Sequence, residues 1–335
     1  MYKYKVKSPI ALFLFKRKDT VLRIIEQIKK VQPDRIYLLS DQGRSPEEIE
    51  RVAETRSAVE TAIDWPCDVV KLYAETNRGV YQNIGLGAKK VFEKEERAIF
   101  LEDDNYPEIT FFQYADEMLD KYEDNERVLW VCGTNYLPEY HNTNGDSYFF
   151  TQHLLPCGWA SWKTKYLKYY NGELNGLLKN KEAFFKTYDT KALAEQQWAS
   201  ILNEYNRKQQ GKRFISWDYQ MLFSIRSNNL LGIAPCVNQI RNIGADNDST
   251  HGGTSLSMIM TRRFCEVPTK PMEFPLKHPS SLEMDKVFNR RTGEIILYPL
   301  TLRLKNKMFS TVKRILGISE EQHLKEELRK RFLGR

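Results

Sequence analysis

The stretch AIFLEDDNYPEI, residues 98–109, places three consecutive carboxylates directly after an apolar run. Residues 99–101 are typical of the end of a buried strand, and Glu102, Asp103 and Asp104 follow without a break. Adjacent like charges repel each other, and a carboxylate at the edge of a core is costly unless a cation meets it. Two interpretations follow: a solvated loop where the strand ends, or a metal ion held at the tip of a sheet.

Strand and helix patterns alternate on both sides of this stretch, through residues 1–133. Continuous apolar runs, typical of strands covered on both faces, are separated by segments with helical spacing of apolar residues. Such alternation predicts an α/β fold, in which a mostly parallel sheet is flanked by helices. The expected strands are residues 10–15, 35–40, 68–73, 97–102 and 127–133.

Local signals also indicate where helices begin. The sequence Ser45-Pro46-Glu47-Glu48 predicts a capping box with proline at the first helical position. An earlier helix is expected from about Asp19, with Asp19 or Thr20 as its N-cap. Residues 81–94 and 181–229 are also expected to be helical, the latter over most of its length.

Ligands of parallel α/β sheets bind beyond the carboxyl ends of the strands. The acidic triplet, Lys16, Arg17, Asp41 and residues 75–78 all follow expected strands. The segment after the first strand, FKRKDT at 15–20, has no glycine, and the chain has no GxxxxGK[ST] loop. A nicotinamide-dependent enzyme and a P-loop ATPase are therefore disfavoured.

Composition narrows the class of protein further. The chain has 335 residues, 41% of them hydrophobic, and no apolar run approaches the ~18 to 20 residues of a membrane span. The apolar run at 10–15 is interpreted as a strand and not as part of a signal peptide. The five cysteines include no CxxC pair, so neither a disulfide framework nor a zinc site is expected. A reducing cytoplasm fits this pattern best.

Positive charge is concentrated at the end of the chain. Residues 301–335 hold ten basic and four acidic side chains, which supply six of the net charge of +7. A groove for nucleic acid across the body of the protein is therefore not expected. Apolar residues at helical spacing in the same segment predict a basic amphipathic helix, which can lie on an anionic membrane. The alternative is a helix that packs on the rest of the chain or on a partner.

Four motifs occur in a characteristic order: the acidic triplet, GWASW at 158–162, SWDYQ at 216–220 and RNIGADNDSTHGG at 241–253. The triplet resembles the DxD metal site of GT-A glycosyltransferases, which use nucleotide-sugar donors. The succession resembles the inverting N-acetylglucosaminyltransferase I family and its bacterial relatives in surface-polysaccharide synthesis. The resemblance covers roughly residues 8–253.

The resemblance implies a role for each carboxylate of the triplet. Asp104 would bind Mn²⁺ or Mg²⁺, Asp103 would meet the ribose side, and Glu102 the donor sugar or the ribose. Such a cation needs oxygen ligands, few of them from protein, and bridging two phosphates stabilises the charge that develops on a leaving diphosphate. Asp41 would accept from the N3–H of uracil, which favours a UDP-sugar. The alternative for Asp41 is a turn aspartate before Gly43.

Other donor-side residues follow from strand ends and from the resemblance. Lys16 and Arg17 could hold phosphate or base, or be surface charge. Asn77 and Arg78 resemble a segment that lines the nucleotide pocket in GT-A enzymes. Arg241 is a phosphate partner by its charge and place.

The acceptor side is expected to hold the catalytic base. Asp218 lies between two aromatic residues, as a base beside a sugar face would, and the alternative is a helix N-cap. Trp159 and Trp162 resemble a segment that packs on acceptor or donor sugar, although such a pair is also an ordinary core stripe. His251 could bind the metal, contact phosphate or lie in a surface loop.

These features predict a GT-A catalytic domain at 1–265, divided at 133 and with a lid loop at 241–253, a Pro-rich linker at 266–300 and a basic tail at 301–335. The expected activity is metal-dependent inverting transfer from a nucleotide-sugar, with a UDP-sugar favoured, to a hydroxyl of a glycan or lipid-linked oligosaccharide. The enzyme would sit on the inner face of a bacterial membrane. The alternatives are a sugar nucleotidyltransferase and a non-catalytic nucleotide-sugar-binding module.

Overall fold

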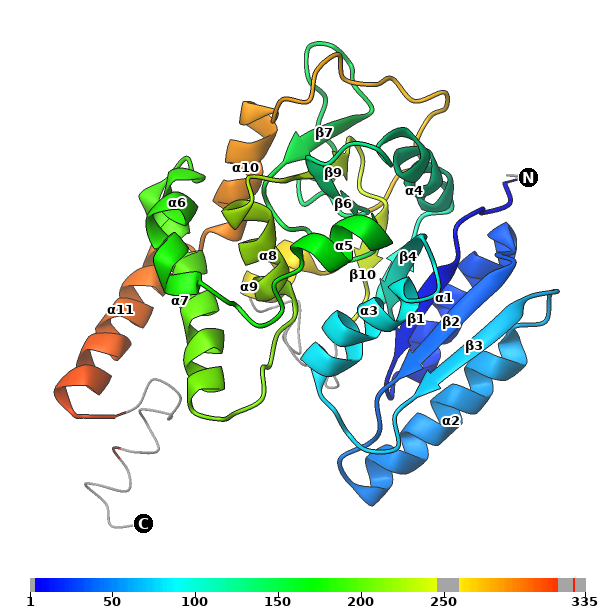
Figure 1. The fold of residues 1–335 in the computed structure, drawn as a ribbon, viewed down its shortest axis with the longest axis horizontal. Helices are drawn as coiled ribbons and strands as arrows, with labels where there is room; N and C mark the ends of the chain where they lie inside the picture. Colours follow the sequence, from blue (N-terminus) through cyan, green and yellow to red (C-terminus); the bar gives the residue numbers. More distant parts are fainter. Residues whose placement is uncertain (1–3, 246–258, 319–327, 329–335) are drawn as a thin grey trace. The chain divides into compact units, whose positions relative to one another are not determined.

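The computed structural model describes residues 4–245, 259–318 and 328. The chain divides into two compact units, Met1–Gly293 and Glu294–Arg335. The first unit carries the sheet and the residues of the four motifs that the structure describes (Figure 1). The second consists of the end of one helix, a further helix and the residues after it.

An eight-stranded sheet forms the centre of the first unit (Figure 1). Its order is β3-β2-β1-β4-β8-β6-β9-β7, with parallel pairing among the first four strands and between β6 and β9. Strand β8 runs antiparallel between β4 and β6, and β7 runs antiparallel to β9. The prediction of an α/β fold with a mostly parallel sheet is confirmed. The strands are β1 Ile10–Leu14, β2 Arg35–Ser40, β3 Asp68–Tyr73, β4 Arg97–Glu102, β6 Val128–Cys132, β7 Tyr148–Thr151, β8 Trp159–Trp162 and β9 Leu231–Pro235.

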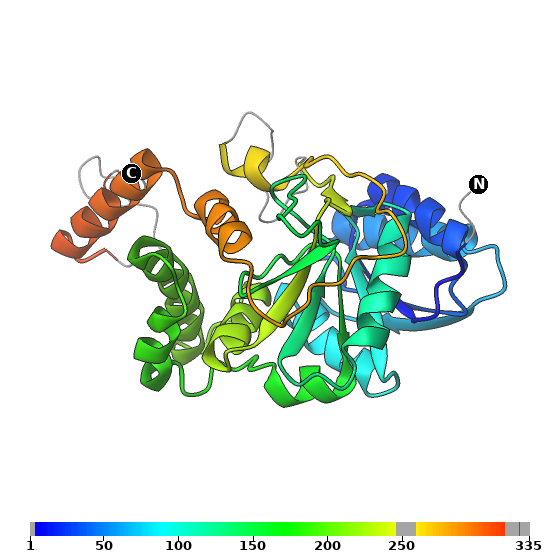
Figure 2. The same ribbon diagram turned by 90° about the horizontal axis from the view of Figure 1, so that it is seen from above.

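Helices cover both faces of the sheet (Figures 1 and 2). On one side lie α1 (Lys18–Val31), α2 (Pro46–Ala62) and α4 (Thr110–Lys121). On the other lie α3 (Leu86–Phe92), which continues the π-helical turn η1 (Tyr81–Gly85), and α5 (Lys163–Tyr169). The expected helix at 81–94 is therefore present, but its first turn is wider than an α-helical turn.

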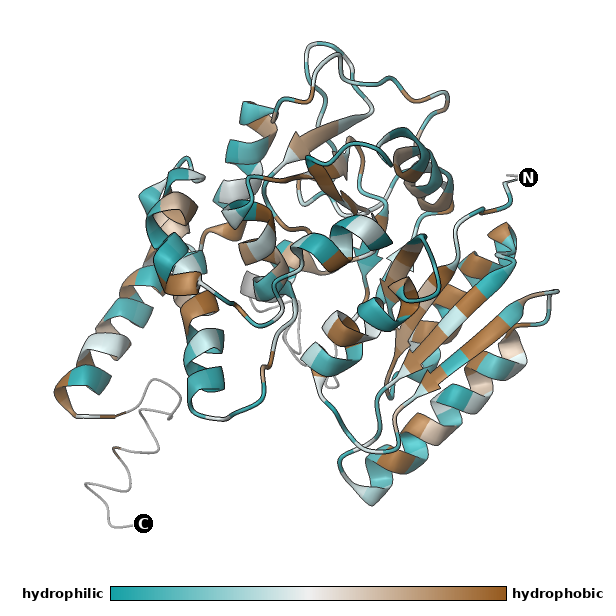
Figure 3. Cartoon of the chain, in the orientation of Figure 1, coloured by the Kyte–Doolittle hydropathy of each residue, from teal (hydrophilic) through white to brown (hydrophobic). Residues whose placement is uncertain are grey.

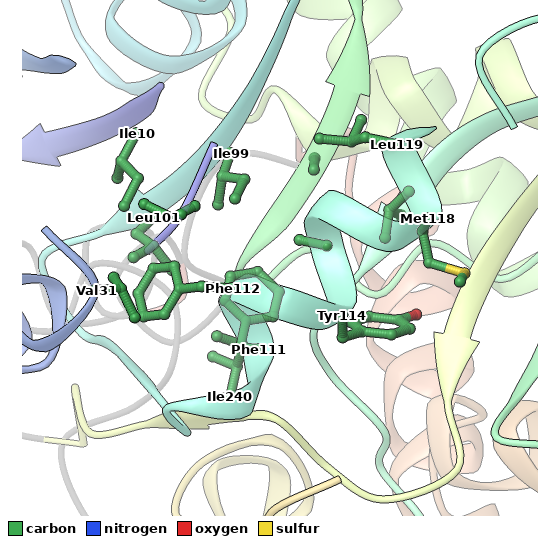
Figure 4. Packing of buried hydrophobic residues seen from close by; sticks show 14 of the residues in the cluster. Ile10, Val31, Ile99, Leu101, Phe111, Phe112, Tyr114, Met118, Leu119 and Ile240 are labelled. Atoms are coloured by element: carbon green, nitrogen blue, oxygen red, sulfur yellow. The ribbon is translucent and has the colours of Figure 1, made fainter. Parts of the chain in front are cut away.

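The core lies between the sheet and helices α1 and α4. Ile10, Ile99 and Leu101 of the strands are fully buried against Phe111 and Phe112 of α4 (Figure 4). Apolar residues concentrate on the strands, and polar residues on the outer helix surfaces (Figure 3). Burying each large apolar side chain contributes roughly 1.5–3 kcal/mol, so this packing fixes where the strands end and thus where the site forms.

The sequence predicted where helices α2 and α1 begin and which residues cap them, and the two predictions have different outcomes. At α2 the Ser45 hydroxyl accepts the Glu48 amide N–H at 3.3 Å, and Pro46 occupies the first position, as predicted. At α1 the predicted start is confirmed to within one residue, since the helix begins at Lys18, but the predicted N-cap is wrong, because Arg17 occupies that position and no side chain caps the helix.

A layer of helices follows β8 in the sequence. It comprises η2 (Leu177–Asn180), α6 (Lys181–Lys186), α7 (Lys191–Gln209) and α8 (Asp218–Ser227). These helices pack around a second cluster of buried residues, Leu174, Leu177, Phe184, Trp198, Ile201, Leu222 and Phe223. This layer brings the start of α8 to the same side of the unit as the acidic triplet.

The predicted Pro-rich linker at 266–300 is not a free spacer over residues 266–293, because these residues belong to the first unit. A short antiparallel sheet pairs β5 (Asn105–Pro107) with β10 (Ile240–Asn242). Two helices follow β10 in the chain, α9 (Ile259–Phe264) and α10 (Lys286–Ile296). The Asn238 side chain donates to the Val267 carbonyl at 3.0 Å, and the Met272 amide donates to Thr110 Oγ1 at 3.0 Å. Buried acceptors and donors of the first unit are thus satisfied by residues 266–293, which belong to that unit.

The second unit contains α11 (Leu300–Ile315), whose apolar residues alternate with basic ones along the helix. Leu304, Met308 and Ile315 are each more than half exposed. In the part of the chain that the structure describes, no helix combines the length and the hydropathy that crossing a membrane requires.

Candidate functional site

A cavity of about 580 Å³ opens at the carboxyl ends of β1, β2 and β4. Register explains the position, because Phe13 of β1 lies opposite Glu102 of β4 and Leu14 lies opposite Ser40 of β2. The residues after each strand therefore meet at one edge of the sheet. Residues of α7 and the start of α8 also line the cavity.

The acidic triplet lies at the floor of this cavity and is held by neighbouring donors. Asp103 Oδ2 accepts the Phe15 amide N–H at 3.0 Å, and Asp104 Oδ1 accepts from the Asn105 side chain at 2.7 Å. Burial raises the pKa of Glu102 well above its usual range, and the charges of Asp104 and Asp103 raise it further. The three carboxyl groups thus repel one another, and a bound cation would relieve this repulsion.

Arg17 supplies a cation at this point. Its Nη1 atom lies 2.7 Å from Asp104 Oδ2 and 3.7 Å from Asp103 Oδ1. Its Nη2 atom donates to the Gly244 carbonyl at 3.3 Å. Charge-assisted hydrogen bonds of this kind are stronger than neutral ones, so Arg17 joins the triplet to the segment that follows β10.

The segment that follows β10 contacts the triplet at Ile243 and Gly244. The Ile243 amide donates to the Asp104 carbonyl at 2.8 Å. A Cβ atom at Gly244 would lie 2.3 Å from Asp104 Oδ2 and 2.8 Å from Arg17 Nη1, so a larger residue does not fit without rearrangement. Gly244 lies within the predicted lid loop at 241–253, of which residues 246–253, including His251, lie outside the described residues.

Asp41 organises a second wall of the cavity. Its Oδ1 atom accepts the amide N–H groups of Gln42 (2.9 Å) and Arg78 (2.8 Å), and its Oδ2 atom accepts those of Gly79 (2.8 Å) and the Asn77 side chain (3.2 Å). Four donors saturate the carboxylate, which is 6% exposed. Asp41 and Asn77 line the cavity, and in this conformation Asp41 shapes the loop at 77–79 through its oxygens.

Of the three remaining donor-side cations, Lys16 lies at the cavity, and Arg78 and Arg241 lie apart from it. Lys16 lines the cavity and donates to Glu48 at 3.0 Å. The Arg78 side chain lines a separate cavity of about 220 Å³ beside β3. In β10, the Nε atom of Arg241 lies 3.5 Å from Glu266 Oε2, and the guanidinium stacks on the Tyr106 ring. Arg241 is not among the residues that line the larger cavity. The structure thus brings Lys16 and Arg17 to the triplet, and places the Arg78 and Arg241 side chains elsewhere.

Asp218 is the first residue of α8 and lines the cavity across from the triplet. Its Oδ1 atom accepts the Ser216 hydroxyl, whose oxygen in turn accepts the Tyr219 amide N–H at 3.2 Å. The capping function that was an alternative for Asp218 is therefore performed by Ser216. The Asp218 carboxylate is left beside the cavity, at the helix end that favours negative charge.

Glu204 of α7 is a cavity residue that the sequence did not single out. It is 1% exposed, and its Oε2 atom accepts the amide N–H groups of Ile215 (2.9 Å) and Ser216 (3.3 Å). Burial raises the pKa of Glu204, and the charge of Asp218 raises it as well. A signal existed in the sequence, because Ser200, Asn203 and Glu204 form a polar stripe at helical spacing, and all three line the cavity.

The two tryptophans of GWASW lie in the core and not at the cavity. Trp159 is 1% exposed and stacks between Phe100 and Trp130, with ring centroids 3.9 and 4.2 Å away. Trp162 points to the other face of β8, where its indole N–H donates to the Leu119 carbonyl. The expectation that they line a sugar site is thus not met, and the core alternative describes them, because β8 is a central strand. Trp217, which stacks on Trp159, is the tryptophan that reaches the cavity.

The residues at the cavity fit a divalent cation in one respect. Three carboxylates converge at the floor, and Mg²⁺ and Mn²⁺ prefer oxygen ligands, with several supplied by phosphate and water. Among the residues described, no set of three or more His, Cys, Asp or Glu side chains is arranged to enclose a metal ion. The fit is therefore to a cation attached at Asp104 and completed by a ligand, with Arg17 moved from its present place.

No protein-family model and no curated protein matches the chain. Among solved structures, the chain is similar to glucosyl-3-phosphoglycerate synthase from Mycobacterium tuberculosis in complex with Mn²⁺, UDP and glucosyl-3-phosphoglycerate. The identity is 10%, the TM-score 0.33, and the match covers 62% of this chain and 81% of that one. It is also similar to UDP-glucose pyrophosphorylase complexed with UDP-glucose, at 8% identity and a TM-score of 0.36 over 70% and 93% of the chains. Similarity at this level supports no inference about mechanism, so function has to be argued from the side chains at the cavity.

Proposed function

We propose that the chain is a metal-dependent inverting glycosyltransferase with the GT-A type of fold, using a nucleotide-sugar donor. One observation carries the proposal: a single cavity joins the acidic triplet and Arg17 on one side to the carboxylate of Asp218 on the other. A diphosphate needs cations where its charge develops, and an attacking hydroxyl needs a base on the opposite side of the sugar. A cavity of about 580 Å³ is of the size that encloses such a ligand.

The donor end would be formed by residues of β1, β2 and β4. Asp104, with Asp103 beside it, would hold Mn²⁺ or Mg²⁺, which when bound stabilises negative charge on the leaving diphosphate. Lys16 and Arg17 would contact phosphate oxygens, since both line the cavity beside the triplet. Asp41 would act through the 77–79 loop, which it orders against the nucleoside. We propose a UDP-sugar as donor on the family resemblance alone, because the four donors that already saturate the Asp41 carboxylate leave no acceptor there for the N3–H of uracil.

In the proposed transfer step, Asp218 accepts the proton of the acceptor hydroxyl. The acceptor hydroxyl gives its proton to the Asp218 carboxylate as its oxygen forms a bond to the anomeric carbon. The bond from that carbon to the diphosphate breaks, and the nucleoside diphosphate leaves with the electron pair. Attack opposite to the leaving group inverts the anomeric configuration. The acceptor is a hydroxyl of a glycan or a lipid-linked oligosaccharide in surface-polysaccharide synthesis.

A panel of UDP-, GDP-, CMP- and dTDP-sugars tests this function, with and without Mn²⁺. The proposal expects metal-dependent binding and turnover of one donor by the wild type, with turnover lost in Asp104→Ala. Asp218→Asn should keep donor affinity and lose most of its transfer activity, with a residual rate that can still be measured. If no donor binds, or if binding ignores both metal and Asp104, the transferase function is wrong. Consumption of a nucleoside triphosphate would support a nucleotidyltransferase instead, and binding without turnover a non-catalytic module.

We also propose that α11 attaches the enzyme to an anionic membrane surface, on the cytoplasmic side. Its apolar residues Leu304, Met308 and Ile315 are exposed, and basic residues flank them. Such a helix binds through buried apolar area and through attraction to anionic lipid. Vesicles of phosphatidylglycerol should bind the protein and neutral phosphatidylcholine vesicles should not. The double substitution Lys305→Glu and Lys307→Glu should abolish binding, and retention of binding by that variant would refute the attachment.

A further inference from the structure

We propose that Glu204 and Ser216 are positioning residues that hold the Asp218 carboxylate in place for proton transfer. The inference rests on the proposed function and adds two residues to it. Three bonds carry the inference: two from backbone amides to Glu204, and one from the Ser216 hydroxyl to Asp218. They form one continuous connection from the middle of α7 to the carboxylate at the start of α8.

The Glu204 carboxylate anchors the loop between the two helices. A single oxygen, Oε2, accepts the N–H groups of Ile215 and Ser216. No helix or strand satisfies these amides, because residues 210–217 lie outside regular structure. A buried amide without an acceptor costs about 1–3 kcal/mol, so the loop is pinned at 215–216 by this side chain.

The Ser216 side chain transmits this position to Asp218. Its hydroxyl donates to Asp218 Oδ1, and its oxygen accepts the Tyr219 amide at 3.2 Å. The hydroxyl therefore cannot turn away without losing two bonds. The Oδ1 atom is engaged by this hydroxyl, and a base has to present a free lone pair to the acceptor hydroxyl. The geometry leaves Oδ2 for that purpose.

The two backbone amides that Glu204 accepts explain why an acidic residue is used at this buried position. Glu204 is 1% exposed and lies on the same cavity wall as Ser200 and Asn203. A carboxylate oxygen carries more negative charge than an amide or hydroxyl oxygen, and accepts two N–H groups at once more strongly. A side chain that served only to fill space at this place would be apolar.

The test compares four variants with the wild type, using the nucleotide-sugar that the donor panel identifies as substrate. Ser216→Ala removes the hydroxyl and Ser216→Thr keeps it; Glu204→Ala removes the acceptor and Glu204→Gln keeps an oxygen in its place. The proposal expects kcat to fall in both alanine variants by about tenfold to a hundredfold, the size of effect that a misplaced catalytic group produces. The KM for the donor and the affinity for UDP should change by less than about twofold, and the Thr and Gln variants should recover most of kcat.

A double variant separates positioning from other effects. In the Asp218→Asn background, Ser216→Ala should cause no further loss of kcat, because residues that act through one group are not additive. An equal loss in both backgrounds, or a change confined to KM, would overturn the positioning role while leaving the transferase function intact. A wild type without turnover of any donor would overturn the proposed function, and the positioning role with it. If Glu204→Ala fails to fold, the Ser216 pair alone decides the question.

Discussion

The guanidinium of Arg17 lies 2.7 Å from the carboxylate of Asp104, the residue expected to hold a metal ion. Both side chains are largely buried, at 10% and 17% exposure, so the solvent screens their attraction weakly. Asp104 also accepts from Asn105 at its other oxygen. An arginine of the chain thus already neutralises the site at which a divalent cation would bind.

Replacing Arg17 should increase the affinity of the protein for Mn²⁺. Arg17→Gln leaves Asp103 and Asp104 without their cation, and the repulsion between them is relieved when Mn²⁺ binds. We expect the affinity for Mn²⁺ in the absence of nucleotide to rise by about tenfold or more, an effect of about 1.4 kcal/mol. Electron paramagnetic resonance of free Mn²⁺ measures this without any turnover. Arg44→Gln is the control, since Arg44 lines the same cavity but pairs with Glu48; equal affinities in all three proteins would refute the competition.

Asp41→Asn should weaken both the fold and nucleotide binding. Asparagine offers one acceptor oxygen, and its amide group would face donors that Asp41 now accepts. We expect a loss of about 1–3 kcal/mol in the free energy of unfolding, with a clear fall in affinity for UDP. Urea denaturation and calorimetric titration measure the two effects.

The matched control for Asp41 is Asp116→Asn. Asp116 is also buried and accepts from the Lys7 and Ser8 amides and the Tyr4 hydroxyl, where it fastens the start of the chain to α4. Its loss should lower stability similarly and leave the affinity for UDP unchanged. If both variants lower UDP affinity alike, the effect of Asp41 is general destabilisation and not a role in the cavity.

Strands were the best-predicted part of the fold. The expected strands at 35–40, 68–73 and 97–102 agree to the residue with β2, β3 and β4, because short apolar and β-branched runs between charged residues favour strands, even at β3, which lies at the edge of the sheet and is only partly buried. The insertion of β8 between β4 and β6 was not foreseen. The pairing of strands distant in sequence depends on packing of the whole sheet, and local pattern contains no record of it. The sequence therefore leaves both interpretations of Trp159 open, a sugar contact and a core residue, and the central place of β8 in the sheet decides for the core.

The candidate site was predictable where it depends on strand ends alone. The convergence of Lys16, Arg17, Asp41 and the triplet follows from parallel strands sharing one edge. The bond between Arg17 and Asp104 spans 87 residues, and Glu204 meets the loop at 215–216 only through the packing of α7 on α8. Side-chain partners of this kind require the tertiary structure, although the polar stripe on α7 pointed to the correct helix face.

Trp159→Phe should separate the core position of this residue from a role in sugar binding. The smaller ring leaves a cavity between Phe100 and Trp130, and we expect a loss of about 1–3 kcal/mol in the free energy of unfolding. The KM for the donor should stay within about twofold of the wild type. Trp217→Phe is the comparison, since Trp217 lines the cavity and should change KM. A large rise in KM for Trp159→Phe with unchanged stability would restore the sugar-contact interpretation.

His153 should make the stability of the first unit depend on pH. Its ring is buried, its Nδ1 atom lies 3.2 Å from Arg226 Nη2, and its Nε2 atom lies 2.9 Å from the Asn289 carbonyl. Arginine can only donate, so Nδ1 must accept and the proton sits on Nε2. Burial, with the charge of Arg226, lowers the pKa of His153 to about 3. The folded protein therefore holds a neutral imidazole that the unfolded chain would protonate below pH 6.5.

The direction of the effect follows from this difference in pKa. Stability from His153 is complete above pH 6.5 and is lost as the pH falls toward 3, by up to about 1.4 kcal/mol per pH unit. His153→Gln should lower the free energy of unfolding near neutral pH and flatten its decline over this range. Urea denaturation at a series of pH values measures both slopes, and His141→Gln, an exposed site, should leave the wild-type slope unchanged. Because burial also lowers the pKa of His278, the informative quantity is the difference between variant and wild type. Identical slopes for His153→Gln and the wild type would show that His153 is not the group responsible.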